Sequence, residues 1–425
     1  MVRSLRRSAF RAGFSRFLLL IAAIVFPLLL CSGAVAQSVA QDSDLVLTGA
    51  TVYPSPQASP IENAVVLLRN GRIAMIGKRG EVKVPASAHT INCSGKFIVA
   101  GFWNSHVHFE NGWNDAAHMP AGQAESKLQQ MLTQWGFTTV WDLGSIPADT
   151  LALRKRIEAG DIAGPRILMA GDIFPMHGHP VYLPASMQLP EAATPQQATQ
   201  LAEWYLHMGL DGIKLFTGAF MGDKPVINMD TPMVKAAADV AHGKHKPVFA
   251  HPQNAAGVDN ALAGGVDVLA HTIPTEGRFT DAELARMKQQ HTALIPTLTL
   301  WTTVVPDPAI QARLVDAGVS ELKSYASQGG TILFGTDVGF QAVYDTAQEY
   351  EFMGRAMGWR EIFASLTTAP VAYFHEPGTG RVEKDSPADL VVLDGDPAAD
   401  VKNFARVIYT IRAGKVIYDG RGSSL

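Results

Sequence analysis

Short apolar runs alternate with amphipathic stretches along most of the chain. Eight runs are predicted to be strands, at residues 96–108, 138–141, 166–169, 212–216, 247–251, 266–271, 293–296 and 331–337. Helical patterns such as 231–243 and 281–290 separate several of them, which is typical of parallel βα units. Residues 98–375 match the ~250 residues of a TIM (β/α)8 barrel, an α/β fold. The alternative is a doubly wound open sheet, but no glycine-rich phosphate loop follows an early strand.

The two ends of the chain have a different pattern, made of short strands and tight turns. Apolar runs at 45–47, 64–68 and 73–77 are matched near the other end by runs at 390–393, 407–411 and 415–418. Asn70-Gly71 and Ala413-Gly414 separate neighbouring runs and indicate hairpins. We therefore predict one small β-sandwich domain built from residues 37–97 together with residues 376–425.

The first 36 residues are typical of a secretory signal peptide. Five arginines precede an uncharged apolar stretch at residues 17–30, and Ala34-Val35-Ala36 supplies the small residues of a cleavage site. Fourteen apolar residues are fewer than the roughly 20 of a membrane anchor. We expect an exported bacterial protein, periplasmic or secreted, without stable membrane association after cleavage. A retained anchor, a lipoprotein site at Cys31 and a twin-arginine signal at Arg6-Arg7 stay open.

Composition and charge narrow the class of protein. Hydrophobic residues make up 47% of the chain and charged residues 17%, which indicates a globular protein with a large core. Removal of the five arginines would change the formal net charge from −4 to −9, which argues against a nucleic-acid partner. Cleavage would leave Cys93 as the only cysteine, so no intrachain disulfide is expected. A homo-oligomer is possible.

Potential metal ligands stand at the ends of five of the eight predicted strands. His106 and His108 are two residues apart, so on a strand both side chains share one face. The other candidates, each in or at the end of a later strand, are Lys214, His251, His271 and Asp337. Singly, the histidines could be buried and hydrogen-bonded, and Asp337 could be a helix N-cap. Together they predict a metal site, because the strands of a barrel end on one rim.

Lys214 lies within an apolar strand, among the other candidates. Burial and nearby positive charge favour the neutral amine, which can add carbon dioxide to form a carbamate that bridges two metals. The alternatives are a lysine that extends to the barrel mouth or a cation that binds substrate.

With this set of candidate ligands the chain resembles the amidohydrolase superfamily, in the imidazolonepropionase-like branch that includes prolidase-type dipeptidases and ochratoxin-degrading amidases. The similar segments include residues 100–108, 212–214, 250–251, 269–272, 335–337 and 386–397. The resemblance implies that His106, His108 and Asp337 bind one metal, that His251 and His271 bind the other, and that carboxylated Lys214 bridges them. It also implies that hydroxide held between the metals attacks a carbonyl and that Asp337 passes its proton to the leaving amine. Such ligands suit two Zn²⁺ best, with Mn²⁺ or Co²⁺ possible.

The expected activity is hydrolysis of an amide bond in a small molecule, an N-acyl amino acid or a dipeptide. The alternatives are a mononuclear enzyme that opens a cyclic amide and, from another class, a non-catalytic exported binding protein. Residues 100–105 and 252–254 depart from the family pattern, which leaves the substrate pocket open. His177 and His179 follow the third strand where relatives carry a histidine that contacts the substrate carbonyl, and His179 is the preferred electrophile. Candidate cations for a substrate carboxylate are Arg166, Lys224 and Arg278.

Overall fold

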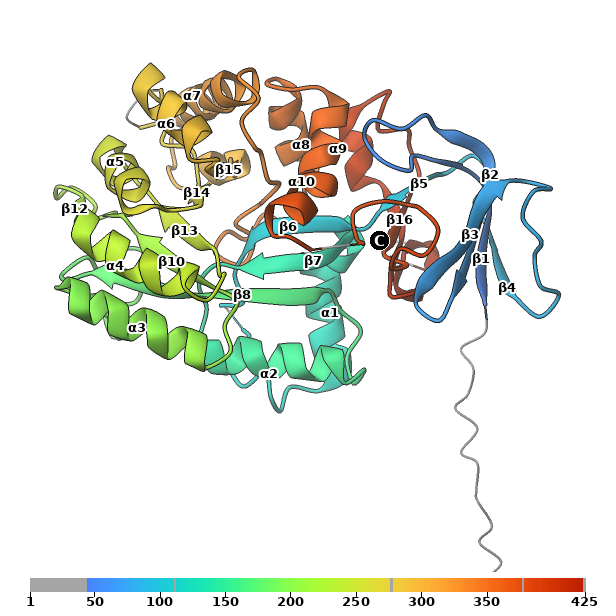
Figure 1. Ribbon diagram of the computed structural model, residues 1–425, viewed down its shortest axis with the longest axis horizontal. Coiled ribbons are helices and arrows are strands. Elements are labelled where there is room, and N and C mark those ends of the chain that lie inside the picture. Colours follow the sequence, from blue (N-terminus) through green and yellow to red (C-terminus); the bar gives the residue numbers. More distant parts are fainter. Residues whose placement is uncertain (1–43, 111, 276–277, 377, 423–425) are drawn as a thin grey trace, which may run out of the picture. The chain divides into compact units, whose positions relative to one another are not determined.

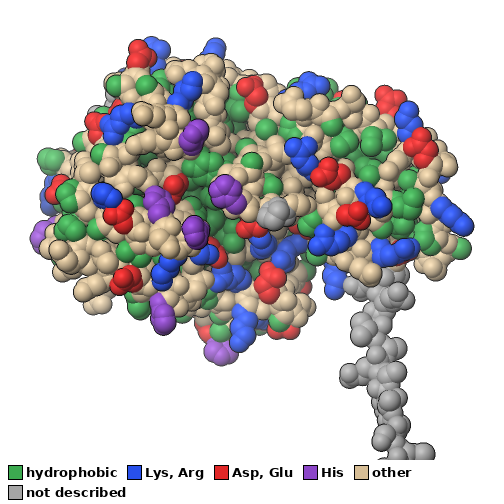
Figure 2. Space-filling model, viewed as in Figure 1, with side chains coloured by type: hydrophobic (Ala, Val, Ile, Leu, Met, Phe, Trp, Pro, Cys, Tyr) green, Lys and Arg blue, Asp and Glu red, His purple; other side chains and the backbone are tan. Residues whose placement is uncertain are grey.

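The computed structural model describes residues 44–110, 112–275, 278–376 and 378–422. All of them belong to a unit formed by residues 42–425. The predicted signal peptide, residues 1–36, lies outside the described residues. None of the described helices combines the length and the apolar character needed to cross a membrane. Acidic and basic side chains are interspersed over the face shown in Figure 2.

Seven parallel strands pair in the order in which they occur along the chain, as a barrel requires (Figure 1). They are β6 (Phe102–Val107), β7 (Phe137–Asp142), β8 (Arg166–Pro175), β10 (Gly212–Phe216), β13 (Val248–His251), β14 (Val268–Ala270) and β15 (Ala293–Ile295).

Helices follow the strands and cover them on the outside (Figure 1). They are α1 (Ala121–Met131), α2 (Pro147–Glu158), α3 (Pro195–His207), α4 (Thr231–His242), α5 (Ala255–Gly264), α6 (Asp281–Gln289), α7 (Pro308–Ala326), α8 (Ala347–Gly354), α9 (Trp359–Leu366) and α10 (Thr368–Tyr373). The main hydrophobic core joins these helices to the strands. Short additional elements are β9 (Glu191–Ala192), β11 (Gly218–Ala219), β12 (Ile227–Asn228), η1 (Thr133–Trp135), η2 (Leu298–Thr302), η3 (Val401–Ala405) and η4 (Gly420–Gly422).

The predicted eighth strand is an irregular segment rather than a regular strand. Ile332 makes an isolated parallel bridge to Leu294 of β15, and Val338 makes one to Val107 of β6. The segment therefore joins the last strand to the first and closes the barrel, which excludes the doubly wound alternative. The backbone of Asp337 lies in the left-handed region, with φ of 60°, so an extended strand cannot continue through this residue.

The ends of the chain form a second sheet, the small sandwich domain (Figure 1). Its strands pair in the order β18-β17-β16-β5-β1-β2-β3, and β4 also pairs with β1. Their bounds are β1 (Leu45–Val52), β2 (Ile61–Arg69), β3 (Arg72–Lys78), β4 (His89–Asn92), β5 (Phe97–Ala100), β16 (Leu390–Leu393), β17 (Val407–Arg412) and β18 (Lys415–Asp419). Both predicted turns join neighbouring antiparallel strands, and their four residues have positive φ, as the favoured hairpin turns require.

The apolar run at 96–108 is divided between the two domains. Its first part is β5, which pairs with β1 and β16 in the terminal sheet, and its second part is β6 of the barrel. Gly101 separates them, and a Cβ there would collide with Thr138 of β7. The barrel thus begins at Phe102 rather than at residue 98. The sheet packs directly on the barrel, since alternate residues of β16 belong to the two cores: Val391 and Leu393 to the barrel core, Leu390 and Val392 to the sheet core.

Candidate metal centre

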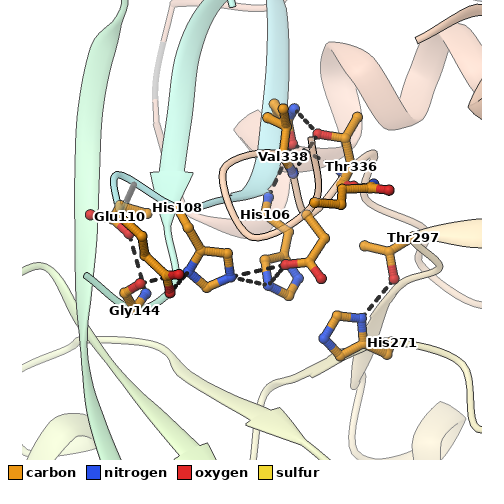
Figure 3. A network of polar contacts seen from close by, with 12 residues as sticks. His106, His108, Glu110, Gly144, His271, Thr297, Thr336 and Val338 are labelled. Carbon is orange, nitrogen blue, oxygen red and sulfur yellow. Dashed lines mark hydrogen bonds and ion pairs between the residues drawn. The ribbon is translucent and has the colours of Figure 1, made fainter. Parts of the chain in front are cut away.

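His106, His108 and Asp337 form a tight group of potential ligands at the C-terminal end of β6. Figure 3 shows the rings of His106 and His108 side by side. The Nε2 atoms of the two histidines lie 3.2 Å apart. Asp337 Oδ1 lies 3.0 Å from His106 Nε2 and 2.9 Å from His108 Nε2. All three side chains are buried, and one donor atom from each lies within 4.8 Å of the others. Two imidazole nitrogens and a carboxylate oxygen that converge in this way can hold a divalent cation.

Neighbouring polar groups fix the orientation of this group. His108 Nδ1 donates to the carbonyl of Gly144 over 2.6 Å, which directs the other ring nitrogen, Nε2, toward Asp337. Asn104 Nδ2 donates to Thr336 Oγ1 over 2.8 Å, and Thr336 N donates back to Asn104 Oδ1 over 3.2 Å. Asn104 belongs to the segment that departs from the family pattern, and it contacts the residue before Asp337.

His271 extends the group toward the middle of the barrel mouth. Its ring centroid lies 4.6 Å from that of His106 and 4.8 Å from that of His251. Thr297 Oγ1 lies 2.7 Å from His271 Nδ1 and donates its own proton to the carbonyl of Pro296 over 2.9 Å (Figure 3). The hydroxyl must therefore accept from Nδ1, so Nε2 of His271 carries the free lone pair.

His251 ends β13 and presents the other ring nitrogen. Its Nε2 lies 3.1 Å from Gln253 Oε1 and donates to it, which leaves the lone pair on Nδ1. Gln253 is part of a segment that departs from the family pattern. The backbone of Gln253 has φ of 41°, so the chain turns sharply after β13 and brings this side chain back to the histidine.

Lys214 lies in the middle of β10, and only 1% of it is exposed. Within the described part of the chain its Nζ makes no hydrogen bond or ion pair, and it lies 5.8 Å from the ring of Phe216. Burial lowers the pKa of Lys214, while the neighbouring Asp172 opposes the shift. Asp172 is its register partner on β8, and burial raises the pKa of that carboxyl. Both shifts favour neutral side chains.

The electrostatics of the histidines favour metal binding. Burial lowers the pKa of His106 to about 3 and that of His251 to about 4, and it lowers the pKa of His271 well below the ordinary value. Burial would also lower the pKa of His108, but its hydrogen bond to Asp337 raises it to about 10. Burial alone would raise the pKa of Asp337, yet His106 and His108 hold it well below its usual range. His106, His251 and His271 are therefore neutral, as metal ligands must be, whereas His108 holds a proton that a bound cation would displace.

A cavity of about 270 Å³ opens above these residues. All six predicted ligands line it, although they come from five separate parts of the barrel rim. Its other lining residues are Glu110, Asp172, Phe174, Tyr182, Leu183, Phe216, Phe220, Gln253, Thr275, Leu300, Trp301, Val304, Val305, Leu314 and Phe340. A bound molecule would thus meet the candidate ligands on one side and apolar walls on the others.

The other predicted site residues lie outside this cavity. His179 has both ring nitrogens 3.1 Å from backbone carbonyls, those of Pro180 and Met187, and His177 is exposed with φ of 64°. Tyr182, from the same loop, lines the cavity instead.

The candidate cations also lie elsewhere. Arg166 is the first residue of β8, at the strand end opposite to the ligands, and its guanidinium lies 3.0 Å from Glu376. Lys224 and Arg278 are exposed and do not line the cavity.

Sequence reasoning missed Asp172, Tyr182 and the aromatic walls. Asp172 was missed because β8 extends to Pro175, beyond the predicted run at 166–169. A longer strand would have placed Asp172 beside Lys214. The loop and wall residues carry no period or spacing that marks them.

The chain is similar to known proteins in sequence and in fold. Residues 97–417 match the model of the amidohydrolase family. The chain is 23% identical to the ochratoxinase of Aspergillus niger over 419 residues, which cover 85% of this chain and 84% of that protein. Among solved structures it is similar to a putative prolidase from Bifidobacterium longum, with a TM-score of 0.76, 25% identity, and coverage of 91% of this chain and 97% of that one. A Xaa-Pro dipeptidase with bound methionine gives a TM-score of 0.75 at 22% identity, with coverage of 89% of this chain and 100% of that one.

Proposed function

The chain belongs to the amidohydrolase family, and on this premise we propose that it is a metal-dependent hydrolase that cleaves an amide C–N bond of a small molecule. The observation that carries the proposal is that six side chains able to hold metal, from separate parts of the barrel rim, line one cavity. The family match and the hydrolases among its structural neighbours support hydrolytic chemistry in general.

The donor set fits divalent metal. We propose that His106, His108 and Asp337 hold one ion and that His251 and His271 hold a second, with Zn²⁺ preferred over Mn²⁺ or Co²⁺. The free lone pairs deduced for His251 and His271, and the direction of His108 Nε2 toward Asp337, support these roles. Bound ions would polarise the substrate carbonyl and lower the pKa of the attacking water.

Lys214 is proposed to carry a carbamate that links the two ligand groups. Its amine is buried and without a partner among the described residues, so the ammonium form is costly and the neutral amine is available for reaction. The nitrogen would attack the carbon of carbon dioxide and lose one proton, which produces a carbamate with two oxygen donors.

Asp337 and Tyr182 are proposed to act on the substrate directly. The Asp337 carboxylate would take the proton of the attacking water and deliver it to the leaving nitrogen as the C–N bond breaks. The Tyr182 hydroxyl makes no hydrogen bond to any described residue and lines the cavity, so it is free to donate to the substrate carbonyl oxygen. In this proposal Tyr182 takes the role that the sequence assigned to His179.

One observation favours a second candidate, a mononuclear hydrolase. Within the described residues, only His106, His108 and Asp337 already lie close enough together to form a ligand group of three. In that enzyme one ion would suffice, and the Lys214 amine would contact the substrate. Counting the metal ions per chain separates the two candidates.

Export is also part of the proposal. The predicted signal peptide would be removed after Ala36, so the mature protein would begin at Gln37. Intact-mass measurement of protein from the periplasm or the medium tests this, and a chain that keeps residues 1–36 would contradict it.

The activity is tested with a panel of amides, using apoprotein prepared with a chelator and then reloaded with Zn²⁺, Mn²⁺ or Co²⁺. We expect activity only after reloading, and we expect Asp337→Asn to lower kcat by about 10²–10⁴. Full activity in the presence of the chelator, or in Asp337→Asn, would contradict the proposal. His177→Ala, outside the cavity, is the matched control.

A further inference from the structure

The walls of the cavity are aromatic and tightly associated. Phe174 and Phe216 stack with centroids 4.0 Å apart, and Phe216 stacks in turn on the ring of His251 at 5.0 Å. Across the cavity lining, Tyr182 and Phe340 meet edge to face at 5.1 Å. Such faces and edges bind another aromatic ring well.

The part of the wall that follows β15 is also apolar. Leu300 and Trp301 come from η2, Val304 and Val305 follow it, and Leu314 comes from α7. Trp301 donates its Nε1–H to Thr272 Oγ1 over 2.9 Å, so its polar atom is satisfied within the protein. This side of the cavity therefore offers carbon surface and little that could bind a charge.

The titratable groups of the lining are unfavourable for an anionic substrate. They are the carboxyl groups of Glu110, Asp172 and Asp337, together with Lys214 and four histidines, all five of which belong to the proposed metal centre. No arginine is among the described lining residues. A carboxylate brought into this cavity would lose its hydration beside other carboxyl groups and gain no guanidinium partner.

Resting on the proposed hydrolase function, we propose that this cavity is specific for small uncharged aromatic amides and rejects dipeptides and N-acyl amino acids. Its volume of about 270 Å³ is near the lower limit of ordinary ligand sites, ~300–1,000 Å³, so the substrate is small. Water would add to the carbonyl carbon, the C–N bond would break, and the nitrogen would take a proton, giving a carboxylic acid and an amine.

The test compares two substrates of nearly equal shape. N-benzoylglycine carries a carboxylate, and in N-benzoylisobutylamine an isopropyl group replaces it. We expect kcat/KM of the metal-loaded enzyme to be at least about 100-fold higher for the isobutyl compound, because an unpaired buried charge is the main difference. Equal values, or a preference for N-benzoylglycine, would overturn the specificity.

Two variants locate the effect in the cavity. Val304 lines the mouth and is 43% exposed, so Val304→Arg adds a cation there with little risk to folding. We expect this variant to reduce the ratio of the two kcat/KM values at least about tenfold. Val343→Arg is the matched control, since Val343 is 36% exposed but does not line the cavity, and it should leave the ratio unchanged. An equal change in both variants would contradict the proposal.

Binding separates this inference from the proposed function. Quenching of tryptophan fluorescence measures the affinity of both compounds whether or not they react. If neither is hydrolysed but the isobutyl compound binds at least about 100-fold more tightly, hydrolysis of these amides fails while the specificity stands. If both are hydrolysed equally well, the proposed function stands and the specificity fails. If neither compound binds, the specificity is wrong.

Discussion

Glu321 provides a direct test of how burial controls charge behind the candidate metal centre. This residue of α7 accepts a hydrogen bond from the backbone N–H of Ile273 over 2.7 Å, two residues after His271. Its other oxygen, Oε1, is buried without a partner. Burial raises the pKa of Glu321 from 4.5 to about 8. The folded protein therefore holds a proton on Glu321 at pH values at which the unfolded chain has lost it.

The magnitude follows from proton linkage. Because the folded pKa is raised, Glu321 costs no stability below about pH 4.5, and the cost grows by ~1.4 kcal/mol per pH unit up to about pH 8. At pH 7 the cost is about 3 kcal/mol, and above the folded pKa it levels off near about 5 kcal/mol. The contribution of this side chain to stability thus decreases as the pH rises.

Glu321→Gln removes the titration and keeps the shape. The amide oxygen can still accept from Ile273, and the amide nitrogen occupies the place of Oε1. The free energy of unfolding is measured in urea by tryptophan fluorescence between pH 5 and 7.5. We expect the difference between Glu321→Gln and the unsubstituted protein to grow in favour of the variant by ~1.4 kcal/mol per pH unit. Glu351→Gln, at an exposed position of α8, should run parallel to the unsubstituted protein. Parallel curves for Glu321→Gln as well would refute the reasoning.

Two further predictions concern the loops around the site. In steady-state assays Tyr182→Phe should lower kcat by about 10–100-fold, because the variant loses the proposed donor to the substrate carbonyl. His179→Ala should change kcat less than about threefold. A larger loss in His179→Ala than in Tyr182→Phe would restore the role of His179. Asn104→Ala removes the hydrogen bonds that hold Thr336 next to Asp337, so we expect about 2 kcal/mol lower stability in urea and weaker zinc binding in a chelator competition. Unchanged zinc affinity in Asn104→Ala would show that Asp337 is positioned without it.

The sequence was most informative where the fold repeats. Parallel strands of a barrel end on one rim, so strand ends alone were enough to place His106, Lys214 and Asp337 around one point. Their roles as ligands stay predictions. Strand boundaries were harder to predict, because the apolar run at 96–108 is buried on both sides of Gly101 and its pattern does not change where it passes from one sheet to the other.

Loops carry no comparable period, and predictions there were incomplete. Which of His179 and Tyr182 reaches the cavity depends on how the loop after β8 folds, and no residue spacing encodes that. Arg166 was assigned to the rim although it begins its strand, at the opposite end. The apolar run at 331–337 predicted a regular strand, but the backbone of Asp337 is left-handed, and the sequence pattern does not mark that conformation.

The central claim is that two metal ions are held by six side chains, with Lys214 between them. Elemental analysis of protein reconstituted with zinc in bicarbonate buffer tests this most directly, with kcat measured on the same samples. The account predicts about two zinc ions per chain in the unsubstituted protein, and about one or fewer, with activity lost, in Lys214→Ala. One zinc ion per chain with full activity would contradict it.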